Sequence, residues 1–138
     1  MKSSTIKDCR VISLPKNHTK KGNITAINNS KEIPFGIKRI YYLYDVPGGE
    51  ERGGHAHKEL QQLIISASGS FELKIDDGEE IKSFHLNRPY EAVLMPPGLW
   101  RELINFSSGS VCLVLASHEY SETDYIRDYN EFVKYKSK

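Results

Sequence analysis

Hydrophobic and polar positions alternate in short runs along most of the chain, and this alternation predicts strands that bury one face. Clusters of Gly, Pro, Asp and Ser separate the runs and provide the backbone angles that tight turns require. Many short strands at near-regular spacing are typical of a sandwich or barrel, so we predict an all-β fold. The predicted strands are Cys9–Leu14, Asn23–Asn28, Lys38–Tyr44, Gln61–Ser66, Ser70–Ile75, Ile81–Leu86, Ala92–Met95, Arg101–Phe106 and Val111–Ser117.

Only the end of the chain has a helical pattern. The spacing of its apolar residues predicts a C-terminal α-helix over about residues 122–134, with Ser121 as the N-cap and Asp124 in the first turn. We expect this helix to pack on the outside of the sheet with its aromatic stripe facing the core. The apolar positions of the stripe are Tyr125, Ile126, Tyr129, Phe132 and Val133.

Length and charge narrow the class of protein. The 138 residues suit one domain over residues 1–138, and 19 Lys and Arg against 18 Asp and Glu give a net charge of +1. That balance argues against a nucleic-acid partner. The longest apolar run, Val111–Ala116, is far shorter than the roughly 20 residues of a membrane helix, and the N-terminus lacks a signal-peptide core. We therefore expect a cytoplasmic protein with two reduced cysteines, Cys9 and Cys112, the latter buried in an apolar strand.

The glycine-rich segment 49–57 contains the most informative pair of residues, His55 and His57. Residues two apart on a strand point to the same face, so both imidazoles would project into one cavity. Imidazoles fill an apolar core poorly, because each carries a donor and an acceptor that need partners. By itself, the His55–His57 pair fits a polar face of a sheet as well as it fits a functional site. The residues around the pair favour a functional site.

Those surroundings resemble the first motif of the cupin superfamily. Gly49 lies six residues before His55, and Gly69 closes the motif, but Gln62 stands where the metal-binding Glu of the family belongs. In the second motif, the turn around Gly98 survives while Arg101 replaces the third ligand His. The resemblance implies a cupin-type jelly roll, the double-stranded β-helix, completed by the C-terminal helix.

The two replacements also predict a metal-free site. A catalytic metal usually has three protein ligands, and only the two imidazoles remain here. If Arg101 faces the cavity, its permanent positive charge further opposes a cation. We expect no metal and no other cofactor, which leaves His55 and His57 for proton transfer near neutral pH.

A closer resemblance covers most of the chain, from about Thr19 to Tyr135. The segments that carry it are Pro34–Tyr42, Arg52–Lys58, Pro97–Trp100 and Val114–Arg127. They are similar to the dTDP-sugar 3,4-ketoisomerases, isomerases that interconvert dTDP-4-keto-6-deoxyglucose and a 3-keto-6-deoxyhexose for the amino sugars of bacterial surface glycans, such as lipopolysaccharide O-antigen or S-layer glycan. The resemblance implies a metal-free homodimer with exchange of the N-terminal strand.

The resemblance also implies roles in catalysis. Moving the ketone from C4 to C3 requires loss of the C3 proton, an enediol and reprotonation at C4, without a redox cofactor. His55 would be the base at C3, and His57 would handle the C4 and O3 protons, although the spacing allows the reverse order. Tyr41 would contribute near the sugar.

Substrate binding requires positive charge and hydrogen-bonding groups. Arg39 lies two residues before Tyr41 and can face the same cavity, where its guanidinium suits a phosphate. The resemblance adds Arg52 as a further phosphate contact. It also adds Lys21, which would act as a point charge at a position where the family has Arg. The remaining candidates, which also have structural explanations, are Gln62 and Arg101.

We expect Tyr42 and Tyr44, on the opposite face of the strand, to lie in the core. Two alternative functions stay open: a nucleotide-sugar 3,5-epimerase and a non-enzymatic sugar-binding cupin. The sequence does not select between galacto and gluco configuration at C4 of the product.

Overall fold

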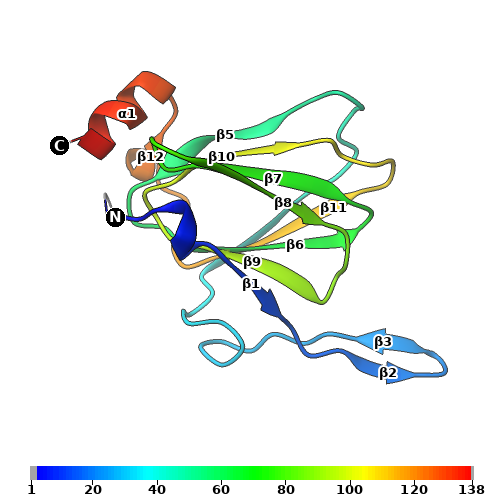
Figure 1. Ribbon diagram of the computed structural model, residues 1–138. Coiled ribbons are helices and arrows are strands. Elements are labelled where there is room, and N and C mark those ends of the chain that lie inside the picture. The colour runs from blue at the N-terminus through cyan, green and yellow to red at the C-terminus, as the bar shows by residue number, and fades with distance from the viewer. Residues whose placement is uncertain (1–2, 138) are drawn as a thin grey trace.

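The computed structural model describes residues 3–137, so residues 1, 2 and 138 of the predicted domain lie outside it. Two five-stranded antiparallel sheets face one another, with the strand orders β1-β9-β6-β11-β4 and β12-β5-β10-β7-β8, as a cupin-type jelly roll (Figure 1). The strands are β1 (Arg10–Ser13), β2 (Asn17–Thr19), β3 (Gly22–Ile24), β4 (Arg39–Leu43), β5 (Arg52–His57), β6 (Gln62–Ser68), β7 (Phe71–Asp76), β8 (Ile81–Leu86), β9 (Glu91–Met95), β10 (Trp100–Ile104), β11 (Val111–Ala116) and β12 (Tyr125–Ile126). The helices are the 3₁₀ turns Ile6–Asp8 and Glu122–Asp124 and the α-helix α1 (Tyr129–Ser137).

The core lies between the sheets, where Phe71, Leu73 and Ile75 of β7 are fully buried. The sheet of β6 is also covered on its outer face. There the loop segment that contains Ile33 and Phe35 packs on it, which is why apolar residues follow one another in β6 without alternation. Within residues 3–137, no helix has the length and apolar character needed to cross a bilayer.

Three strands, β2, β5 and β12, are absent from the predicted set, although the shared face of His55 and His57 already assumed a strand at β5. The predicted strand Asn23–Asn28 ends at Ile24 and pairs with β2 in an exposed hairpin that extends away from both sheets (Figure 1). The segment Arg52–His57 forms β5 although its glycines suggest a turn, and the two residues of β12 pair with it. These strands are specified by their partners across the sheet more than by their own residues.

The predicted helix over 122–134 is wrong at its start. Glu122–Asp124 is a 3₁₀ turn, and Tyr125 and Ile126 pair with His57 and Ala56 instead of continuing a helix. The helix begins only at Tyr129, where the Asp128 carboxylate accepts the N–H of Glu131 as an N-cap does. The pairing of β12 and the contacts of Asp124 override the helical spacing.

The helix packs on the outside of the sheet, as predicted, but two tyrosines predicted to be buried are exposed. Phe132 is fully buried against Trp100 and Ile126, and Tyr129 and Tyr135 pack on the same cluster, so α1 packs outside the sheet through an aromatic face. Tyr42 and Tyr44 were predicted in the core, which is wrong: they are 59% and 61% exposed. They point outward because β4 is an edge strand whose alternate residues face the interior.

Candidate active site

A cavity of about 270 Å³ opens between the sheets, and both sheets contribute side chains to it. Its lining combines apolar side chains with the buried Arg101 and with Arg52 and Arg127, whose side chains are exposed. This places polar chemistry in a partly enclosed space. The lining residues are Arg39, Tyr41, Leu43, Arg52, Gly53, His55, Gln62, Ile64, Arg101, Leu103, Val114, Tyr125 and Arg127.

A bulge in β5 sets the position of His55. The register between β5 and β10 pairs Arg101 with His55 but Leu103 with Arg52, so β5 has one extra residue. Gly53 takes a φ of +77° at this point, a left-handed conformation that suits glycine. The bulge re-aims the strand next to the histidine, as bulges beside active sites often do.

The two histidines form a close pair, as their alternation predicts. Their Nε2 atoms lie 3.1 Å apart, and the rings meet edge to face with centroids 4.7 Å apart. His55 borders the cavity, whereas His57 is fully buried and reaches the cavity only through His55. The Tyr125 ring packs against both, with centroids 4.9 Å from His55 and 4.4 Å from His57.

Asp124 bonds the nitrogen of His57 that faces away from His55. Its Oδ2 lies 3.0 Å from Nδ1 of His57, and its carboxylate also accepts the backbone N–H groups of Glu59 and Leu60. Sequence reasoning placed Asp124 in a helix and missed this contact. The only signal for it was its place in the segment that resembles the ketoisomerases.

A second chain of hydrogen bonds runs along the other side of the cavity. The buried Arg101 guanidinium donates from Nη1 to Oε1 of Gln62 and from Nη2 to the carbonyl of Leu99, 3.1 Å away. The Nε2 of Gln62 donates to the Tyr41 hydroxyl at 3.0 Å. Gln62 is therefore oriented by Arg101, and the Tyr41 oxygen accepts, which leaves the Tyr41 hydrogen free to donate elsewhere.

Arg39 and Arg101 both have unsatisfied donors. The Arg39 guanidinium lies over the rings of Tyr41 and Tyr120, 4.7 Å and 5.2 Å from the centroids. Its Nη1 and the Nε of Arg101 are buried without a hydrogen-bond partner among the described residues. Buried donors of this kind are costly unless an acceptor arrives, so they favour an anionic ligand.

The mouth has two further arginines. Arg127 forms a bidentate pair with Glu122, with donor–acceptor distances of 2.6 and 2.9 Å, and stacks on Tyr125 at 4.1 Å. Arg52 lines the mouth with an exposed side chain. The predicted residues Arg39, Tyr41, Arg52, Gln62 and Arg101 are thus brought together, and the prediction missed Tyr125 and Arg127.

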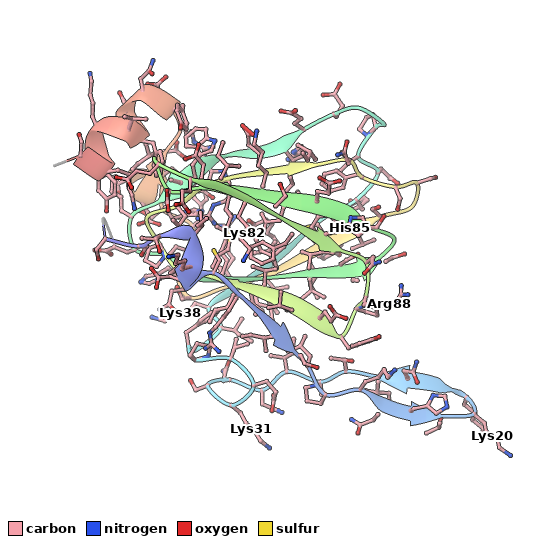
Figure 2. The ribbon with its side chains drawn as sticks, viewed as in Figure 1. Lys20, Lys31, Lys38, Lys82, His85 and Arg88 are labelled. Atoms are coloured by element: carbon pink, nitrogen blue, oxygen red, sulfur yellow. The ribbon has the colours of Figure 1, made fainter. Side chains whose placement is uncertain are left out.

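Lys21 is the one predicted site residue that the fold keeps apart from this cavity. It lies between β2 and β3, and its backbone N–H donates to the Thr19 hydroxyl within the hairpin turn. Figure 2 shows the adjacent Lys20 at the outer tip of that hairpin, far from the paired sheets. Within one chain, Lys21 therefore makes no contribution to the cavity.

The cavity does not fit a metal ion. Gln62 and Arg101, at the positions of the two lost cupin ligands, are bonded to each other. Among residues 3–137, no cluster of three or more His, Cys, Asp or Glu side chains could hold a metal. A guanidinium at a ligand position repels a cation, so these residues do not suit a metal site.

Burial keeps both histidines neutral. Desolvation, reinforced by the positive charge of Arg101, lowers the pKa of His55 to about 3 and holds the pKa of His57 well below its ordinary value. Burial also lowers the pKa of Arg101, to about 10, so Arg101 stays charged near neutral pH. The site thus combines neutral bases with a fixed positive charge.

These lowered pKa values predict a loss of stability in mild acid. Between about pH 6.5 and 5, the unfolded chain protonates both histidines and the folded chain does not, so the free energy of unfolding falls as pH falls. At pH 5, each histidine lowers the free energy of unfolding by up to about 2 kcal/mol relative to neutral pH. We expect urea unfolding to show a smaller drop from pH 7 to 5 for His57→Asn than for wild type.

The matched control is His85→Asn, which removes an exposed histidine on β8 (Figure 2). It should retain the wild-type drop in stability. An equal drop in wild type, His57→Asn and His85→Asn would contradict the neutral burial of His57.

The fold and site together define a jelly-roll protein with a neutral histidine pair beside a cationic mouth. The chain matches the FdtA family, described as WxcM-like, C-terminal, over residues 7–137. It belongs to this family, and its relatives identify it as an isomerase.

Relatives with known structures or activities agree with the family. The TDP-4-oxo-6-deoxy-alpha-D-glucose-3,4-oxoisomerase of Aneurinibacillus thermoaerophilus is 44% identical over 129 residues, covering 94% of this chain and 93% of that protein. A 3,4-ketoisomerase from Helicobacter canadensis is 45% identical, with a TM-score of 0.93 over 95% of this chain and 98% of that one.

A 3,4-ketoisomerase from Thermoanaerobacterium thermosaccharolyticum, solved with TDP, is 37% identical, with a TM-score of 0.94 over 96% of this chain and 97% of that one. The resemblance predicted from the sequence is confirmed.

Proposed function

We propose that this chain is a TDP-sugar 3,4-ketoisomerase that converts dTDP-4-keto-6-deoxyglucose to a dTDP-3-keto-6-deoxyhexose by metal-free acid–base catalysis. The observation that carries the proposal is a neutral His55 at the wall of the cavity, opposite a Tyr41 hydroxyl that is free to donate. The ketoisomerase relatives support the reaction, and the complexes of one of them with TDP and with TDP-4-keto-6-deoxyglucose support the substrate.

The first half of the reaction uses these two groups. His55 takes the C3 proton, which the neighbouring ketone makes acidic, and the electrons of that bond form the C3–C4 double bond. The carbonyl electrons move to O4, which takes a proton from Tyr41 to give the enediol. Arg101, buried without an ion pair among the described residues, stabilises the negative charge that develops on the oxygen.

In the second half of the reaction, the carbonyl forms at C3 and the proton is added at C4. The O3 hydroxyl gives its proton to the Tyr41 oxygen as the C3 carbonyl forms, and C4 receives a proton from His55, so both side chains return to their starting protonation states. His57 acts on these protons through His55, because His57 does not itself border the cavity. No atom or electron is gained or lost overall, so the reaction needs no redox cofactor.

The diphosphate of the substrate requires cations at the cavity mouth. Arg39, which lines the cavity, has an unpartnered buried donor, and Arg52 contributes an exposed side chain to the same lining. A cavity of about 270 Å³ is small for a whole nucleotide sugar; drug-sized ligands fill roughly 300–1,000 Å³. The hexose would occupy the cavity, and the nucleotide would lie across the mouth.

The test is incubation with dTDP-4-keto-6-deoxyglucose in deuterated water, followed by NMR. Ketoisomerisation gives a 3-keto product with deuterium at C4. A 3,5-epimerase would exchange C3 and C5 while the 4-ketone remains, and a binding cupin would give neither result. Either of the last two outcomes would reject the proposal.

We further propose that the chain works as one domain in a homodimer, in the cytoplasm, where it supplies a keto sugar for a surface glycan. The outer face of the β4 sheet exposes Ile40 and Tyr42, and beside it lies a groove of about 470 Å³ whose wall includes Ile65 and Leu113. Apolar surface of this kind favours an interface. In a single chain, β1 pairs with its own β9, and exchange would replace this by the same pairing with a partner's β1.

Light scattering should therefore give twice the chain mass of 15.7 kDa. We expect Tyr42→Glu to shift the protein toward the single-chain mass, because a charge would be buried in the interface. Glu79→Gln, on the exposed turn before β8, is the matched surface control. A single-chain mass for wild type at micromolar concentration would contradict the dimer.

A further inference from the structure

The carboxylate of Asp124 is held in one orientation by backbone donors. Its Oδ1 accepts the N–H of Glu59 at 2.7 Å, and its Oδ2 accepts that of Leu60 at 3.3 Å. Both backbone groups donate to carboxylate oxygens, and a carboxylate can only accept hydrogen bonds. Nδ1 of His57, 3.0 Å from Oδ2, must therefore carry a hydrogen and donate it.

This contact determines where the hydrogens lie on both imidazoles. A neutral His57 with its hydrogen on Nδ1 has a bare Nε2 that accepts. The Nε2 of His55, 3.1 Å away, must then donate, which leaves Nδ1 of His55 without a hydrogen. That nitrogen makes no hydrogen bond to any described residue, so its lone pair is free to take a proton at the cavity wall.

We propose that Asp124 is a positioning residue for the isomerisation: through His57 it fixes the tautomer of His55 that can act as base and stabilises the charge that this base acquires. The inference rests on the proposed function and assigns a role to the last residue of the 3₁₀ turn Glu122–Asp124, which leads into β12.

Proton transfer gives the carboxylate its second effect. When the C3 proton binds Nδ1 of His55, the hydrogen on Nε2 of His55 can move to Nε2 of His57. The positive charge then lies on His57, 3.0 Å from the Asp124 carboxylate, which offsets the burial and the Arg101 charge that oppose a cation on either imidazole. In a buried site with little water, this pairing is much stronger than it would be in solvent.

Asp124→Asn should reverse the hydrogen bonds. The amide oxygen would take the place of Oδ1, because the N–H of Glu59, at 2.7 Å, approaches the side chain more closely than the N–H of Leu60, at 3.3 Å. The amide NH₂ would then donate to Nδ1 of His57 and move its hydrogen to Nε2. His55 would have to accept at Nε2 and carry its own hydrogen on Nδ1, and the basic lone pair would be lost.

Nitrogen-15 NMR of the imidazole rings tests this assignment in the free protein, without substrate. In wild type we expect hydrogen on Nδ1 of His57 and on Nε2 of His55, and in Asp124→Asn the opposite pair. Hydrogen on Nε2 of His57 in wild type would overturn the proposal, and this measurement stands even where the variant does not fold.

Kinetics provides the second measurement. We expect Asp124→Asn to lower kcat by roughly 10²–10⁴ while the Kd for TDP stays within about twofold, a split that a loss of folding would not produce. Asp128→Asn, four residues away, makes the same change of side chain but keeps the N-cap of α1, because an amide oxygen also accepts the N–H of Glu131, and it should retain wild-type kcat. Wild-type kcat in a folded Asp124→Asn would also refute the proposal. If the wild-type tautomers are as expected but wild type converts no substrate, the proposed function fails and the tautomer assignment survives.

Discussion

Replacement of His55 with Asn is expected to lower kcat by roughly 10²–10⁴, the usual contribution of a positioned acid–base group. His55 is the only member of the histidine pair that borders the cavity, and its Nδ1 has no hydrogen-bond partner among the described residues. Asn retains a polar side chain of similar reach but offers no basic nitrogen. The measurement is the rate of conversion of dTDP-4-keto-6-deoxyglucose, with exchange of the C3 proton for deuterium followed separately.

Exchange at C3 distinguishes loss of the base from loss of a later step. His55→Asn should abolish both exchange and isomerisation, because no group remains to take the proton. His57→Asn should also lower kcat within the same range. In that variant, His55 loses the imidazole that accepts its Nε2 hydrogen and that can take the positive charge from it. The control is again His85→Asn, and near-wild-type turnover in both site variants would refute the assignment.

The histidine pair could be predicted from the sequence because its information is local. Alternation places His55 and His57 on one face of a strand whatever the rest of the chain does. Gln62 and Arg101 could be named because they replace ligands in a spaced motif, but the hydrogen bond between them joins residues 39 positions apart. Such long-range pairing is determined by packing of the two sheets and has no local signature.

The contact of Asp124 with His57 is a clearer example of an interaction that the sequence does not predict. Its carboxylate reaches His57 across 67 positions, and it does so because β12 pairs with β5. The spacing of Tyr125, Ile126 and Tyr129 predicts a helix through this region, and in isolation that prediction is reasonable. Three hydrogen bonds to Asp124 and the pairing of Ile126 with Ala56 outweigh it, so the residue's role becomes visible only in the folded chain.

Two substitutions test the donor at the opposite wall of the cavity, and both are expected to lower kcat by roughly 10²–10³, the typical effect of losing one oxyanion donor. Tyr41→Phe removes the hydroxyl. Gln62→Glu keeps the hydroxyl but turns it: one carboxylate oxygen accepts from Arg101, and the other accepts the hydrogen of Tyr41 that would otherwise point to the substrate.

Comparing Tyr41→Phe with Gln62→Glu separates the effect of losing the Tyr41 hydroxyl from the effect of turning its hydrogen away from the substrate. The Kd for TDP should change little in either, because neither residue is assigned to the diphosphate, and Tyr44→Phe, an exposed tyrosine just beyond the same strand, should behave as wild type. If Tyr41→Phe is impaired and Gln62→Glu is not, the hydroxyl acts without direction from Gln62. If both retain wild-type kcat, the proton for O4 comes from another group, and Arg101 alone stabilises the enediolate.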